Sequence, residues 1–401
     1  MTVFRPSHVV LTPALALLMA ACSPTEDQPA RTPTTVAARE PGPPQVAAIR
    51  PVDPIEAQTP AAPIPAPAPV SDPAPTSSPS PSSASPSPSS TSPPPAAAQA
   101  INQASFSASG AKAKGAAARD SLIRVEVLLD RAGFSPGVID GQPGGNLKGA
   151  ISGWQSAHGL PADGQLTAAV WDGLTQADPA PVAVAYVVTA DDTKGPFIGA
   201  VPGDMEAMAK LDRLGFTSEA QLLAEKFHMD QKLLAALNPG ADLGVPGTAL
   251  VVTAPGAAAA PPVSRVEVDK SARQVRALDQ AGKLVAVFPA TVGSTERPAP
   301  SGAWAVRDIV HNPDYTFDPT RLTFGKADHK LTIPPGPNNP VGSTWIGLTK
   351  ETYGIHGAPD PTKVGKVASH GCVRLTNWDA RRLASMVKKG MPVVFVGQAS
   401  S

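Results

Sequence analysis

The chain has 401 residues, enough for two or three modest domains. Its 33 Lys and Arg residues balance its 33 Asp and Glu residues, so it offers no basic field for a nucleic acid partner. Its two cysteines cannot build a disulfide framework. Half of its 48 prolines lie in the first quarter of the chain, which makes the folded part shorter than the length suggests.

The first 21 residues have the pattern of an export signal. An apolar run from Val9 to Ala21 follows Arg5, is too short to span a bilayer and ends in small residues. Cys22 directly after two alanines resembles a bacterial lipobox, in which the cysteine is lipid-modified after cleavage; the alternative is an ordinary secretory signal. With Ser23 next, we expect a periplasmic protein, lipid-anchored at Cys22 to the outer membrane.

Residues 22–117 are predicted to be a disordered tether. Pro, Ala, Ser and Thr dominate this segment, and such a composition cannot bury enough apolar surface to offset chain entropy. In polyproline II geometry, at about 3.1 Å per residue, it could reach up to about 290 Å. A tether between lipid and cell wall and a passive spacer would have the same composition.

Residues 118–177 are predicted to form a small all-α domain of three helices. Leu122, Val125, Leu128 and Leu129 recur at helical spacing, and turns follow at 137–141 and 158–164. This order of helices and Asp-Gly turns resembles a peptidoglycan-binding domain, although residues 142–146 depart from the usual Phe-Gly-x-x-Thr. For Trp154 and Trp171, packing in the core is a commoner role than contact with a glycan.

Residues 185–254 are predicted to form a small α+β module after a linker at 178–184. A strand at Tyr186–Thr189, two helices around 221–237 and a strand near 248–252 resemble a LysM-type glycan-binding module with an insertion after its first strand. Its His228 is expected to be an ordinary helix-face residue.

Residues 263–397 alternate between apolar and polar side chains, which predicts half-buried hairpins. One helix follows Cys372, with Asn377 as the expected N-cap, Gly390 just past its end and a last strand at Val393–Val396. This part of the chain is therefore expected to be mainly β with a supporting helix.

Cys372 has no expected disulfide partner within the chain, because the other cysteine, Cys22, is assigned to the lipid anchor. Gly371 lets the backbone approach a substrate closely, as Gly357 does beside His356, and a nearby imidazole can activate a thiol as a nucleophile. A buried structural thiol is the alternative. Zinc held by His356, His370 and Cys372 is disfavoured, because a single residue separates the last two and no fourth ligand is evident.

The region from 263 to 396 resembles the catalytic domain of bacterial L,D-transpeptidases of the YkuD-like family. The resemblance rests on these stretches: PATVGS at 289–294, PSGAW at 300–304, IPPGPNNPVG at 333–342, WIGL at 345–348, GIHG at 354–357 and SHGCVRL at 369–375. It implies a multi-domain chain whose mainly β catalytic domain, a β-sandwich with a supporting helix, follows the all-α domain and the α+β module.

The resemblance also implies roles. Cys372 would be the nucleophile that attacks the bond between meso-diaminopimelate and D-alanine in a tetrapeptide stem. His356 would be the general acid and base, oriented by the main-chain carbonyl of Gly357, and the amides of Gly371 and Cys372 would form the oxyanion hole. The residues implied to line the substrate pocket are Ser369, His370, Arg374 and Tyr353. For Tyr315 and Trp345, strand packing is the commoner role, and no cofactor is required.

The acceptor stays open at this point. A diaminopimelate amine would give a 3-3 cross-link, a lysine of a wall-anchored lipoprotein would give anchoring, and water would give carboxypeptidase activity. Peptidoglycan stem peptides and glycan are thus the expected partners. A non-catalytic wall-binding lipoprotein is the competing class, disfavoured by intact His356 and Cys372. A papain-like endopeptidase is also disfavoured, because in that class the cysteine precedes the histidine, whereas here His356 precedes Cys372.

Overall fold

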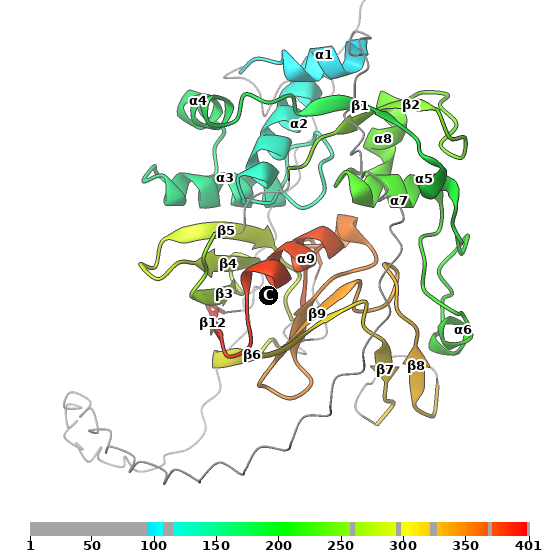
Figure 1. Cartoon of the computed structure of the whole chain (residues 1–401). Helices are drawn as coiled ribbons and strands as arrows, with labels where there is room; N and C mark the ends of the chain where they lie inside the picture. Colours follow the sequence, from blue (N-terminus) through cyan, green and yellow to red (C-terminus); the bar gives the residue numbers. More distant parts are fainter. Residues whose placement is uncertain are drawn as a thin grey trace, which may run out of the picture. The chain divides into compact units, whose positions relative to one another are not determined.

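The computed structural model describes residues 95–106, 115–256, 261–293, 298–320, 327–367 and 371–398 (Figure 1). The predicted signal peptide, Cys22 and most of the predicted tether lie outside these residues. No helix in the described ranges is both long and apolar enough to cross a membrane.

The predicted all-α domain is present as three helices. They are α2 (Ala116–Arg131), α3 (Gly145–Ala157) and α4 (Ala168–Ala177). The side chain of Thr167 caps α4 by accepting a hydrogen bond from the amide of Val170 at 3.3 Å. Trp154 and Trp171 are both buried, which confirms the expectation that they pack in the core.

A short helix, α1 (Ala96–Asn102), lies inside the segment predicted to be disordered, so that prediction is wrong for these residues. Ala98 and Ile101 are fully buried in the same core as the α2 side chains. The Asn102 side chain accepts the amides of Val182 and Ala183 at 2.8 and 2.9 Å. A helix of seven residues is too short to be stable alone even when it is rich in Ala, so α1 depends on these tertiary contacts, which composition does not reveal.

The second module has the predicted strand–helix–helix–strand order. β1 (Ala183–Val187) pairs antiparallel with β2 (Ala249–Thr253), with Tyr186 opposite Leu250. The two main helices are α7 (Glu219–Lys226) and α8 (Gln231–Leu237), and the insertion carries α5 (Ala190–Thr193) and α6 (Met205–Ala209). β1 begins three residues before the predicted strand, inside the predicted linker at 178–184, because Val182 and Ala183 are buried.

The mainly β region contains one curled sheet of eight strands, in the order β11-β10-β9-β6-β12-β3-β4-β5. The bounds are β3 (Arg265–Asp269), β4 (Gln274–Leu278), β5 (Leu284–Pro289), β6 (Gly302–His311), β9 (Thr344–Leu348), β10 (Gly354–His356), β11 (Val373–Arg374) and β12 (Pro392–Val396). A separate hairpin joins β7 (Tyr315–Phe317) and β8 (Leu331–Ile333), and η1 (Pro361–Lys363) is a 3-10 turn.

The long strand β6 belongs to both halves of this sheet. Its first residues, up to Ala305, pair with β12, and its residues from Val306 onward pair with β9, with a register shift between Val306 and Asp308. One apolar core collects buried side chains from both halves and from helix α9 (Asn377–Met386). The predicted β-sandwich with a supporting helix is therefore a single sheet that bends around its core.

Helix α9 differs from the prediction at both ends. Thr376, not Asn377, is its N-cap, because the Thr376 hydroxyl accepts the amide of Asp379 at 3.1 Å. Asn377 is instead buried, and its side chain contacts three other segments. The helix ends at Met386, four residues before Gly390.

The three folded modules belong to one compact unit, Pro86–Ser401, and are not independent domains joined by linkers. Helix α3 packs against β5, and Ser135 donates a hydrogen bond to Asp379 of α9 at 3.0 Å. His228 of the second module stacks on Trp378, with ring centroids 4.9 Å apart, and accordingly is not an ordinary helix-face residue. The buried contacts at these boundaries hold the modules together.

Candidate active site

Strand pairing brings the candidate catalytic residues to one face of the sheet. β10 and β11 are parallel, with His356 opposite Arg374 and Ile355 opposite Val373. Cys372 lies two residues before Arg374, directly before β11, and lines the same pocket as Arg374 and His356. Ile355 and Val373 point the other way and belong to the core. A loop separates His356 from Cys372 in the sequence, and the pairing of β10 with β11 brings the two ends of that loop together.

His356 is buried and has a defined tautomer. Its Nδ1 lies 2.7 Å from the Gly357 carbonyl oxygen, the contact expected from the sequence. A carbonyl oxygen only accepts, so Nδ1 carries the proton and Nε2 keeps its lone pair. Burial, aided by the charge of Arg374, lowers the pKa of His356 to about 3. The imidazole is therefore neutral at physiological pH and ready to accept a proton.

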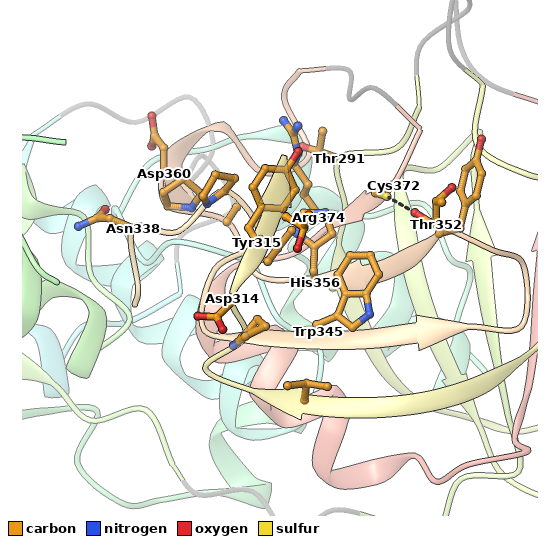
Figure 2. A pocket seen from close by; sticks show the side chains of 18 of the residues that line it. Thr291, Asp314, Tyr315, Asn338, Trp345, Thr352, His356, Asp360, Cys372 and Arg374 are labelled. Carbon is orange, nitrogen blue, oxygen red and sulfur yellow. Dashed lines mark hydrogen bonds between the residues drawn. The ribbon is translucent and has the colours of Figure 1, made fainter. Parts of the chain in front are cut away.

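Cys372 lies just before β11, after a glycine in an unusual conformation. Gly371 has φ +119°, which side-chain-bearing residues rarely adopt. The Cys372 Sγ lies 3.7 Å from the carbonyl oxygen of Thr352 (Figure 2). Burial raises the pKa of the Cys372 thiol, while the Gly354 amide and Arg374 act in the opposite direction. Cys372 and His356 thus rest as a neutral pair, and the thiol becomes a good nucleophile only when a base removes its proton.

The Arg374 guanidinium has no carboxylate partner among the residues that the structure describes, and its Nε is buried without a hydrogen bond. Burial lowers the pKa of Arg374. Tyr315 lies beside it in Figure 2, and burial together with Cys372 raises the pKa of Tyr315 to about 12. A planar, half-buried cation with open donors is suited to a carboxylate ligand.

Two aromatic side chains expected to pack within strands line the pocket instead. Trp345 stacks on His356 with ring centroids 5.5 Å apart, and Tyr315 faces the same space. The strand register explains the stacking, since Trp345 on β9 lies opposite His356 on β10. Tyr353, a predicted pocket residue, also lines the pocket and lies next to Gly371. Periodicity alone does not distinguish these roles.

Glycine is required at position 357 for packing, and not for the expected close approach of the backbone to a substrate. A Cβ there would overlap the Oδ1 atom of Asn377, which accepts the Ser343 amide at 3.0 Å. Asn377 also donates to the Pro337 carbonyl at 3.1 Å and to Glu225 of the second module at 2.9 Å. The close approach at Gly357 therefore serves packing around Asn377, which supports the loop that orients His356.

Two predicted pocket residues, Ser369 and His370, lie outside the described residues. His370 is also one of the three ligands of the zinc alternative, so that site includes a residue outside the described ranges. His311 and His329 are exposed and do not line the pocket.

The pocket has a volume of about 1530 Å³ and contains Cys372, His356 and Arg374 together (Figure 2). Other lining residues come from the loop at 336–341, the loop at 351–364 and the β7–β8 hairpin. The second module also contributes Val201, Met205 and Met208, for which the sequence carries no signal. The space is large enough for a peptide substrate.

Comparison with known families decides what this pocket belongs to. Residues 264–395 match the family model described as the YkuD L,D-transpeptidase catalytic domain. Residues 264–395 are an L,D-transpeptidase catalytic domain. Residues 119–174 match the model described as "Putative peptidoglycan binding domain", which places that domain before the L,D-transpeptidase domain as the sequence predicts.

Relatives of the L,D-transpeptidase domain carry matching names. "Putative L,D-transpeptidase YkuD" of Bacillus licheniformis is 28% identical over 172 residues, covering 43% of this chain and 89% of the relative. "Probable L,D-transpeptidase ErfK/SrfK" of Escherichia coli is 28% identical over 189 residues, covering 45% of this chain and 60% of the relative. A solved L,D-transpeptidase from Mycobacterium smegmatis aligns over 38% of this chain and 64% of that one, with a TM-score of 0.28 and 21% identity.

Proposed function

We propose that the chain is a cysteine-dependent cell-wall L,D-transpeptidase. The observation that carries the proposal is a buried, neutral His356, whose Nδ1–H is bound to the Gly357 carbonyl, in the same pocket as Cys372. The family match of residues 264–395 supplies the reaction class, and peptidoglycan is the substrate.

In the first half-reaction, Nε2 of His356 takes the thiol proton as the Cys372 sulfur attacks the carbonyl carbon of diaminopimelate. The bond to the D-alanine nitrogen breaks, and His356 returns the proton to that leaving amine. The product is a thioester on Cys372. The amides of Gly371 and Cys372 stabilise the oxyanion, a role favoured by the glycine conformation at 371.

In the second half-reaction, an acceptor amine attacks the thioester carbon. His356 removes the amine proton, the C–S bond breaks, and the thiolate regains a proton from His356. A diaminopimelate amine gives a 3-3 cross-link and a lipoprotein lysine gives wall anchoring. Water in place of the amine would make the protein an L,D-carboxypeptidase.

Location follows from the substrate. We propose that lipid on Cys22 anchors the protein to the outer membrane from the periplasmic side, where stem peptides are reached. Growth with a labelled fatty acid tests the anchor, because the wild-type protein should incorporate label and the Cys22→Ser variant should not.

The enzyme proposal is tested by incubating the full chain with disaccharide-tetrapeptides and analysing the products by mass spectrometry. We expect release of D-alanine together with a 3-3 linked dimer. A shortened tripeptide without any dimer would select the carboxypeptidase alternative. An unchanged tetrapeptide would contradict both and leave a non-catalytic wall-binding protein.

Arg374 is proposed to bind the terminal D-alanine carboxylate. We expect Arg374→Gln to raise KM for the tetrapeptide by about tenfold or more, because a charge-assisted, forked pair is lost. A donor ending in a carboxamide provides the control, since its KM should be nearly the same for wild type and variant. An equal rise in KM for both donors would contradict the assignment.

A further inference from the structure

One wall of the catalytic pocket comes from outside the L,D-transpeptidase domain. Val201, Met205 and Met208, all in the insertion of the second module, line the same pocket as Cys372. All three side chains are half-buried, and no residue of helix α6 is fully buried. Helix α6 packs against β8, the partner of the strand that carries Tyr315 (Figure 1). The insertion therefore extends the surface around the catalytic residues.

The insertion is fixed to the L,D-transpeptidase domain by main-chain hydrogen bonds. The Leu214 amide donates to the Pro335 carbonyl at 2.9 Å, and the Asn338 amide donates to the Leu214 carbonyl at 3.1 Å. Leu214 is fully buried, and a Cβ on Gly336 would overlap its carbonyl. Such buried backbone pairing is expensive to break, so α6 stands as a built part of the pocket.

The side chains of this wall are apolar. The L,D-transpeptidase domain contributes charged side chains to the pocket lining, Arg374 and Asp360 among them, whereas the insertion contributes two methionine thioethers from α6 and Val201, which precedes that helix. Methionine is unbranched and polarisable, and adapts to irregular apolar surfaces. A stem peptide has both kinds of surface, with carboxylates and an amine as well as alanine methyl groups and the methylene chain of diaminopimelate.

We infer that Val201, Met205 and Met208 are a specificity surface that binds the apolar side of the donor stem peptide. This inference rests on the proposed function. It means that the second module serves the reaction directly, in addition to any binding of the wall.

The test compares full-chain variants that change only this wall. Met205→Gln combined with Met208→Gln should raise KM for the tetrapeptide about five- to tenfold, because each amide must be desolvated against an apolar ligand. The rate of Cys372 alkylation by iodoacetamide should stay as in wild type. Met205→Leu with Met208→Leu should restore KM, and Glu206→Gln, exposed on the same helix and outside the pocket lining, should leave it unchanged.

A second readout is independent of turnover. Tetrapeptide should protect Cys372 from iodoacetamide, and the glutamine variant should need about five- to tenfold more peptide for half-protection. Equal KM and equal protection in wild type and glutamine variant would overturn the inference. A slower alkylation in that variant would also overturn it, as a structural effect. Absence of D-alanine release from wild type with protection intact would overturn the proposed function alone.

Discussion

Replacing Cys372 with alanine is expected to reduce D-alanine release from tetrapeptide stems by more than about a thousandfold, because no thioester can form without the sulfur. Binding of the full chain to isolated peptidoglycan should stay unchanged, since Cys372 lies outside residues 119–174, which match the putative peptidoglycan binding domain. The measurement is mass spectrometry of the peptide products, with a sedimentation assay for wall binding.

The matched control is Ser385→Ala, on the exposed side of helix α9, which should retain wild-type turnover. Thermal unfolding of both variants shows whether the fold is kept. Wild-type rates of D-alanine release from a folded Cys372→Ala protein would contradict the assignment of the nucleophile.

Replacing His356 with glutamine is expected to lower kcat/KM by about a hundred- to ten-thousandfold, the range for loss of a general base. The resting pair is neutral, because burial raises the pKa of Cys372 and lowers that of His356, so the thiol depends on this base. The rate of alkylation of Cys372 should fall as well. His311→Gln, an exposed histidine outside the pocket lining, is the control and should change neither rate.

The wild-type pH profile gives an independent measurement of the same pair. With a His356 pKa of about 3 in the folded protein, the imidazole stays neutral and able to accept a proton from pH 7 down to pH 5. We therefore expect kcat/KM to stay level over this window, whereas a histidine with an ordinary pKa near 6.5 would lose most of its activity there. A fall centred near pH 6.5 would contradict a buried neutral base.

The sequence by itself determined the modules and the identity of the candidate catalytic residues. Alternating apolar residues predict the hairpins at 265–289, and β3, β4 and β5 confirm them. Helical spacing predicts the three helices between 118 and 177, and the antiparallel pairing of β1 and β2 follows the predicted order of the second module. These features are local, because side-chain periodicity of 2 or 3.6 is written directly into the chain.

The tertiary structure alone decided how these parts meet. Residues 96–102, predicted to belong to the tether, form helix α1. Asn377, predicted to be a helix cap, is a buried residue that supports the loop carrying His356. The tertiary structure also put Trp345 against His356 and brought Met205 and Met208 into the pocket of Cys372. Each of these facts depends on contacts between distant segments, and no periodicity along the chain encodes which segments will share a surface.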